Sequence, residues 1–246
     1  MPDPVQPSLF DAMRAHLELE RDMGQDSVPR PKRTRLAPPS PLAPAPTPPA
    51  TASPSGGETA EAFLKRRAAE IANCTKCTLA EGRTQVVYGV GSPNARLVFI
   101  GEGPGRDEDL QGEPFVGRAG QLLTKIIQAM GVKRSDVYIA NIVKCRPPEN
   151  RLPRPNEVRA CFPYLEEQFE AIRPKVIVCL GKLAASVLLE TDASMGALRG
   201  KFYERNGIQV MVTYHPAYLL RKNDPAEKKK VWEDMQKVLE FLAKEN

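Results

Sequence analysis

Apolar and polar residues alternate in blocks along most of the chain, and these blocks predict an α/β protein. Four short runs are apolar throughout and rich in β-branched residues, which is typical of strands buried on both faces. These runs are 96–100, 136–143, 175–181 and 208–214. The segments between them carry apolar residues three or four positions apart, which predicts helices. The helical segments are 61–73, 118–130, 156–172, 182–190 and 225–244.

Strands that alternate with helices predict a three-layer αβα fold with a central four-stranded parallel sheet. In such folds ligands bind beyond the carboxyl ends of the strands. The loops that follow the four predicted strands should therefore converge on one site. These loops are 101–117, 141–156, 181–182 and 214–222.

Composition divides the 246 residues unevenly. Residues 29–54 contain ten prolines and almost no large apolar side chain. Such a segment cannot bury enough surface to offset the entropy lost on ordering. We therefore expect a disordered N-terminal arm over residues 1–60, with a short helix at about 8–23, and one folded domain over 61–246.

The charge is modest, because the formal net charge is +5. It permits a polyanionic partner without requiring one, and the basic cluster at 29–35 adds little. No apolar run reaches the length of a membrane span, and the N-terminus lacks a signal-peptide pattern. We expect a cytoplasmic monomer, in which the five cysteines do not form disulfides.

Four of the cysteines form a metal-binding pattern, whereas Cys179 lies inside an apolar run and suits the core. The four are Cys74, Cys77, Cys145 and Cys161. The chain has only two histidines, so a site here must be all-thiolate, which suits structural zinc or an iron–sulfur cluster. Zinc sites usually have two close cysteine pairs. The wide second spacing here favours a cluster with a structural role.

The loop between the first strand and its helix is rich in both glycine and carboxylates, GEGPGRDEDLQGEPFVGRAG at 101–120. It lacks the Lys-Ser/Thr ending of a phosphate-binding loop and does not complete the dinucleotide-binding pattern. Carboxylates would also repel phosphates. The loop therefore suits a neutral, planar ligand, with Phe115 as a stacking face.

Three stretches, together with the cysteine spacing, resemble the iron–sulfur (family 4) uracil-DNA glycosylases. They are GEGPGRDEDLQGEPFVGRAGQLL, YIANIVKCRPPENRLP and YHPAYLLR, and the likeness runs from about residue 63 to 242. The resemblance implies a four-stranded parallel sheet with a 4Fe–4S cluster at its edge. It also implies hydrolysis of the N-glycosidic bond of uracil in DNA, which leaves an abasic site for base excision repair.

The same resemblance implies roles for individual residues. Cys74, Cys77, Cys145 and Cys161 would hold the cluster. Glu102 and Gly103 would line the uracil pocket, Phe115 would stack on the flipped base, Asn141 would read its edge and His215 would face O2. Leu219 and Leu220 would enter the vacated position of the duplex, beside Arg221. Lys144, Arg146 and Arg151 are further candidates for phosphate contacts.

These residue types suit the reaction, because a donor at O2 stabilises the departing uracil anion and His215 can supply it. The best-known single-domain uracil glycosylases carry a water-positioning aspartate where this chain has Gly103. We therefore expect Glu108, or else Glu102, to position the water.

Two other activities fit part of the pattern. A non-catalytic, metal-stapled DNA-binding module would need the cysteines but no base pocket. A related glycosylase of different specificity traps its product through a histidine in an arginine-rich insert, but loop 145–156 contains no histidine. Separately, Gln6–Phe10 reads QPSLF and resembles the peptide with which bacterial proteins bind the replication sliding clamp.

Overall fold

The computed structural model describes residues 53–54 and 57–245. All of them belong to one compact unit. The helix predicted at 8–23 and the Gln6–Phe10 segment lie outside the described residues.

A mixed six-stranded sheet, in the order β1-β3-β2-β4-β6-β5, forms the centre of this unit. Its strands are β1 (Val90–Gly91), β2 (Leu97–Gly101), β3 (Tyr138–Asn141), β4 (Val176–Leu180), β5 (Phe202–Arg205) and β6 (Ile208–Thr213). The four predicted strands form the central parallel part. The sequence did not predict β1 and β5, which pair antiparallel at the two edges. Both are short and incompletely buried, so they lack the apolar run that marks a central strand.

Helices cover both faces of the sheet. The α-helices are α2 (Ala60–Ile71), α3 (Arg106–Gln111), α4 (Arg118–Ala129), α5 (Pro155–Ile172), α6 (Lys182–Leu189), α7 (Met195–Leu198), α8 (Pro216–Lys222) and α9 (Pro225–Lys244). Three short 3-10 turns are η1 (Thr78–Ala80), η2 (Arg134–Asp136) and η3 (Pro148–Asn150). The five predicted helices are confirmed, whereas α3 and α8 form within segments predicted as loops and the sequence did not predict α7. No helix in the described part of the chain combines the length and apolar character needed to cross a membrane.

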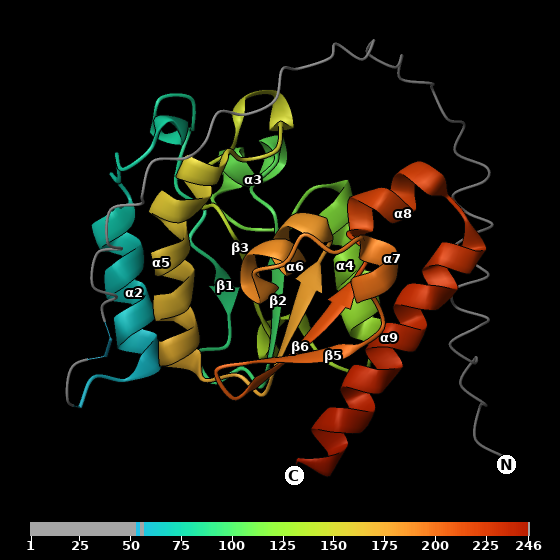
Figure 1. Ribbon diagram of the computed structural model, residues 1–246. Coiled ribbons are helices and arrows are strands. Elements are labelled where there is room, and N and C mark those ends of the chain that lie inside the picture. The colour runs from blue at the N-terminus through green and yellow to red at the C-terminus, as the bar shows by residue number, and fades with distance from the viewer. Residues whose placement is uncertain (1–52, 55–56, 246) are drawn as a thin grey trace, which may run out of the picture. The chain divides into compact units, whose positions relative to one another are not determined.

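Strand alternation divides the core into two layers. Val98 and Ile100 of β2 belong to the cluster that includes side chains of α2, α5 and α6. Leu97 and Phe99 belong to the opposite cluster, with side chains of α4 and α9. Figure 1 shows α2 and α5 on one side of the sheet and α4 and α9 on the other. The structure therefore has the predicted three layers, because successive strand residues point to opposite faces.

The parallel central strands bring their carboxyl ends to one edge of the sheet. Gly101 at the end of β2 is paired with Asn141 at the end of β3. The segments that follow β2 and β6 form α3 and α8, which lie at this same end (Figure 1). The sequence motifs at 101–120, 141–152 and 214–221 are therefore gathered at one place.

One buried carboxylate fastens α9 to this edge. Asp234 is fully buried, and it accepts hydrogen bonds from Arg199 Nη2 at 2.7 Å and from Thr213 Oγ1 at 2.7 Å. Thr213 is the last residue of β6, and His215 follows two positions later. The Asp234 carboxylate thus holds the strand end that carries a candidate site residue.

We expect Asp234→Ala to lower the free energy of unfolding by about 3 kcal/mol, because it leaves the buried Thr213 hydroxyl without an acceptor and removes the carboxylate partner of the Arg199 guanidinium. Urea denaturation measures this loss. The matched control is Glu233→Ala, one position away on the exposed face of α9, which should change stability by less than about 0.5 kcal/mol. Equal effects of the two substitutions would contradict the assignment.

Candidate active site

A cleft of about 1070 Å³ lies beyond the carboxyl ends of the central strands. Its lining includes eight of the residues predicted from the sequence: Glu102, Gly103, Glu108, Phe115, Asn141, Arg151, His215 and Arg221. These residues come from three separate segments of the chain, which lie at or after the ends of β2, β3 and β6. Only the parallel arrangement of the sheet brings them together.

Asn141 lies at the bottom of the site with an unpaired polar atom. Its side chain is buried, and Oδ1 has no hydrogen-bond partner among the described residues. The neighbouring strand leaves room for this amide only because position 101 is glycine. A Cβ on Gly101 would lie 2.4 Å from Asn141 Oδ1 and 2.5 Å from Phe115 Cζ. A buried carbonyl oxygen without a partner is costly, and it fits a ligand that supplies the missing donor.

Phe115 is held in a strained backbone conformation above this amide. Its φ is +56°, in the left-handed region that large residues avoid. Gly120 accommodates the bend, because a Cβ there would lie 1.9 Å from the Phe115 carbonyl carbon. The next two backbone amides, of Val116 and Gly117, each donate to Glu108 Oε1 at 3.0 Å. The surrounding contacts therefore fix the orientation of the ring.

His215 faces the Phe115 ring, with 5.6 Å between ring centroids. It caps α8, and its Nδ1 accepts the backbone N–H of Ala217 at 3.1 Å. Burial, reinforced by the positive charge of Arg221, lowers the pKa of His215 to about 4. The imidazole is therefore neutral near pH 7. Because Nδ1 is the acceptor, the proton resides on Nε2, which leaves this nitrogen as a hydrogen-bond donor.

The two carboxylates expected to position water differ in their surroundings. Glu108 is the N3 residue of α3, and its carboxylate already accepts backbone N–H groups of Gly105, Val116 and Gly117. It organises the loop. The Glu102 carboxylate has no hydrogen bond among the described residues, and burial raises its pKa, opposed by Arg221. The choice between the two stays a prediction, and Glu102 is the one whose carboxylate is not already engaged by backbone N–H groups.

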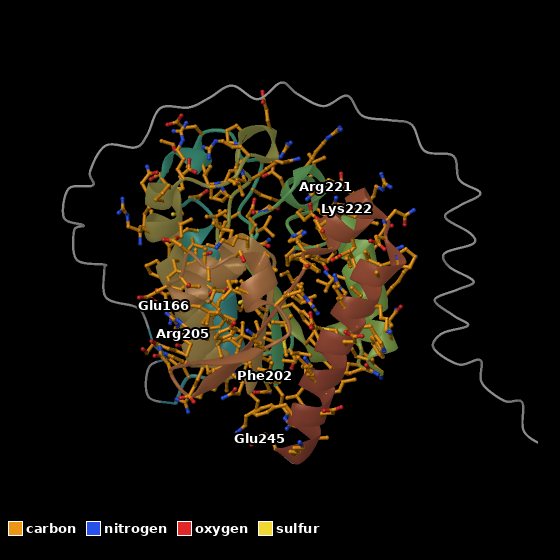
Figure 2. All side chains as sticks on the ribbon, turned by 45° about the vertical axis from the view of Figure 1, so that its right-hand side comes forward. Glu166, Phe202, Arg205, Arg221, Lys222 and Glu245 are labelled. Carbon is orange, nitrogen blue, oxygen red and sulfur yellow. The ribbon has the colours of Figure 1, made fainter. Side chains whose placement is uncertain are left out.

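Two residues expected to contact DNA are withdrawn from the surface. Leu219 is only 2% exposed, since α8 turns it inward, whereas Leu220 is half-buried and Arg221 is exposed. Figure 2 shows Arg221 and Lys222 at one end of the folded part and Glu245 at the opposite end. Lys144 is also buried, and its Nζ donates to Gln168 Oε1 at 2.6 Å. Lys144 is therefore a core residue and not a phosphate contact.

The basic residues of the loop after β3 have other partners. Arg146 Nε donates to Asn150 Oδ1 at 2.8 Å. Arg151 is paired with the buried carboxylate of Glu157 through contacts of 2.8 and 2.6 Å. Arg151 and Asn150 nevertheless line the cleft, so this loop forms part of its wall.

The four patterned cysteines surround a second, smaller cavity, whose lining also includes Arg83 and Lys144. Cys145 Sγ accepts from Arg83 Nη1 at 3.3 Å, and Cys161 Sγ accepts from the backbone N–H of Lys144 at 3.2 Å. All five cysteines are free thiols. Among the described residues, no three His, Cys, Asp or Glu side chains are placed to hold a single metal ion. Hydrogen-bond donors and cations beside sulfur atoms stabilise the negative charge of thiolates, and thiolates are the form in which cysteines bind a metal centre.

Burial raises the pKa of three of these four thiols. They are Cys77, Cys145 and Cys161, the last to about 12. Cys179 is apart from them, buried in β4 as expected.

Several residues of the cleft were not found from the sequence. Lys182, Tyr214 and Tyr218 line it, and the two tyrosine rings are 4.8 Å apart. Leu152 also lines it, although its side chain is 66% exposed. Leucines and tyrosines are common in cores, so only their position shows that they belong to the cleft.

Comparison with known proteins finds one matching family and several relatives of this chain. The model of a family described as "Uracil DNA glycosylase superfamily" matches residues 88–236. The chain is also similar to a type-4 uracil-DNA glycosylase of Archaeoglobus fulgidus, with 47% identity over 183 residues. This alignment covers 71% of this chain and 91% of the relative.

Two further type-4 uracil-DNA glycosylases are similarly related. The protein of Thermotoga maritima is 44% identical over 189 residues, which cover 76% of this chain and 98% of the relative. The protein of Saccharolobus solfataricus is 46% identical over 183 residues, which cover 71% of this chain and 84% of the relative.

The buried imidazole gives a direct pH test. In the His16→Ala variant, where His215 is the only histidine, a ¹⁵N NMR titration should show a midpoint near pH 4, well below the ordinary 6.5. Above this midpoint, Nε2 should carry the proton. A midpoint near 6.5, or a proton on Nδ1, would contradict the burial and the hydrogen bond from Ala217.

Proposed function

This chain belongs to the type-4 uracil-DNA glycosylases of the uracil-DNA glycosylase superfamily, and we propose that the cleft beyond the sheet is where it removes uracil from DNA. The enzyme hydrolyses the N-glycosidic bond and leaves an abasic site, the first step of base excision repair. The unpaired Asn141 amide beneath Phe115 is the observation that carries the assignment of the reaction to this cleft.

Asn141 reads the base in this proposal. Its Oδ1 accepts N3–H of uracil and its Nδ2 donates to O4, which satisfies the buried amide. Cytosine presents an acceptor at N3 and a donor at N4, so both contacts would become repulsive. A site built to pair with a polar edge rejects the wrong edge strongly, because its own buried groups stay unpaired.

Phe115 supplies the stacking face for the extruded base. Removing a base from the duplex stack costs a few kcal/mol, and stacking on an aromatic ring recovers about 1–3 kcal/mol. The ring is held before the base arrives by the Glu108 contacts of the two following residues. Binding therefore requires little further ordering of the loop.

His215 stabilises the leaving group. As the bond from C1′ to N1 breaks, its electron pair passes to uracil and negative charge develops at O2. The neutral imidazole donates Nε2–H to O2, and it needs no proton transfer to do so. A pKa of about 4 ensures that this donor is uncharged at neutral pH.

Glu102 acts on the sugar side. Positive charge develops at C1′, and the adjacent carboxylate stabilises it electrostatically. Water then adds to C1′, and Glu102 accepts the proton that the water loses. Partial burial raises the pKa of Glu102 and so makes it a stronger base. Gly103 lines the cleft with its backbone, and glycine is required there because a Cβ would lie 2.8 Å from Val143 Cγ2.

The α8 rim binds the DNA backbone. Arg221 and Lys222 are exposed beside the cleft and contact phosphates, and Leu220 lies at the duplex surface. Leu219 supports this rim from within, because it is buried.

Cys74, Cys77, Cys145 and Cys161 hold a 4Fe–4S cluster in this proposal. Free thiols around one cavity, donors to two sulfurs and a nearby cation support it. The bound cluster would supply a rigid cross-link, since its ligands come from the segment after α2, the loop after β3 and helix α5. The chain's own residues perform the excision elsewhere, in the cleft.

Three wider proposals rest on the sequence. We propose a monomeric enzyme that works on DNA in the cytoplasm, and that Gln6–Phe10 binds the replication sliding clamp.

An excision assay tests the main proposal. Single- and double-stranded oligonucleotides with one uracil should break after incubation and alkali, and matched thymine oligonucleotides should stay intact. Asn141→Ala should lower kcat/KM by about 100-fold or more, because the base edge is no longer read. Asn94→Ala changes an exposed asparagine away from the cleft and should leave the rate unchanged.

Free uracil provides a second readout. It should raise the melting temperature of the original protein and of Asn94→Ala, but not of Asn141→Ala. Stabilisation of all three proteins would place uracil outside the Asn141 pocket.

Metal analysis tests the cysteine site independently of excision. Protein purified without oxygen should absorb light at about 400 nm. It should also contain iron and acid-labile sulfide in equal amounts. Cys161→Ser should lose most of the iron, whereas Cys179→Ala, in the core of β4, should keep it. Zinc in place of iron in the original protein would overturn the cluster.

A further inference from the structure

Leu152 is an exposed leucine on the wall of the active-site cleft. It is 66% exposed, the most of the large apolar side chains in the described part of the chain. Two other large apolar side chains are exposed in the described part of the chain, Leu110 at 55% and Val90 at 36%, and neither lines the cleft. Single exposed leucines are ordinary on protein surfaces, so the position and the setting of Leu152 carry the argument.

The loop that presents Leu152 is rigid. Pro147 and Pro153 on either side of it are buried. The backbone N–H of Arg151 donates to the carbonyl of Pro148 at 3.1 Å. The Arg151 guanidinium donates to the Leu152 carbonyl at 2.9 Å while it pairs with Glu157. The next backbone N–H, of Arg154, donates to Glu157 Oε2 at 2.6 Å.

These contacts hold the backbone of the loop and leave the leucine side chain in solvent. An exposed leucine without a function would not require a backbone fixed by so many contacts. A side chain that must enter a defined position benefits from it, because less entropy is lost on binding.

The residues around Leu152 suit a polyanion. Arg146, Arg151 and Arg154 lie on the same loop, and Glu149 is the one carboxylate at its tip. Arg151 also pairs with Glu157 of α5. Lys182 and Arg221 line the same cleft on other segments. The loop belongs to the end of the sheet that also carries α3 and α8; it is the yellow segment near α3 in Figure 1. An apolar tip among cations, at the mouth of a base pocket, matches a duplex whose base has been extruded.

We propose that Leu152 is a wedge, a side chain that enters the base stack of duplex DNA beside the extruded uracil and delays its return. This inference rests on the proposed function. It places a point of insertion on a different segment of the chain from the α8 rim, whose proposed contacts are with phosphates. Apolar side chains from other proteins enter base steps in this way. The buried position of Leu219 leaves Leu152 as the exposed leucine at the cleft.

A comparison of duplex and single-stranded substrates tests the wedge. Leu152→Ala should lower kcat/KM for uracil in duplex DNA by about tenfold, because the vacated stack is no longer filled. The rate on the same strand without its complement should change by less than about twofold, since no stack has to be held open. Leu152→Met keeps an apolar side chain of similar size and should restore most of the duplex rate.

The fluorescence of 2-aminopurine placed next to uracil reports the open stack. A duplex with non-cleavable uracil should brighten when the original protein binds, and less with Leu152→Ala. The matched control is Leu110→Ala, which removes another exposed leucine and should match the original protein in both assays.

The outcomes separate this inference from the proposed function. Failure of the original protein to release uracil from either substrate would overturn the proposed function itself. Normal excision combined with equal loss on both substrates in Leu152→Ala, or with no loss on either, would overturn only the wedge.

Discussion

The pairing of Gly101 with Asn141 across two parallel strands is the constraint on which the active site depends. Parallel pairing places both residues at the end of the sheet where the loops begin. The absence of a side chain at position 101 then leaves the space into which the Asn141 amide and the Phe115 ring both project. Any larger residue at this position would have to displace one of them. The proposed base pocket is thus a gap in strand packing, lined by one unsatisfied amide oxygen and one aromatic ring.

The carboxylates that make the sequence of this region unusual serve mostly to fold it. Glu108 gathers three backbone N–H groups, and Asp109, buried at 2% exposure, accepts the N–H of Thr84. Irregular loops have unpaired backbone donors, and carboxylates satisfy several of them at once. The acidic composition therefore follows from the loop geometry that orients Phe115. Of the two carboxylates that line the cleft, Glu102 is the one without a hydrogen bond in the described part of the chain.

The buried carboxylate of Glu157 connects the cysteine site with the cleft. It accepts from Thr78 Oγ1, one residue after Cys77, and from Arg151 on the cleft wall. The Arg151 salt bridge lowers the pKa of Glu157 to about 2, so this junction stays charged at neutral pH. A cross-link between the cysteine-bearing segments would stabilise the same loop that presents Leu152. In the proposed function, this connection would let a cluster away from the reacting atoms support the DNA-binding surface.

Periodicity and residue type determined much of this protein without a structure. The apolar runs predicted the four central strands, the amphipathic segments predicted the five long helices, and the motifs predicted some of the residues that line the cleft. These features are local or depend on parallel topology alone. The tertiary structure decided which side of each short element faces the core. It buried Leu219 and Lys144, engaged Glu108 with backbone amides and left Leu152 in solvent. A seven-residue helix or a proline-rich loop has too few residues to show a period, so its orientation depends on distant neighbours that become adjacent only on folding.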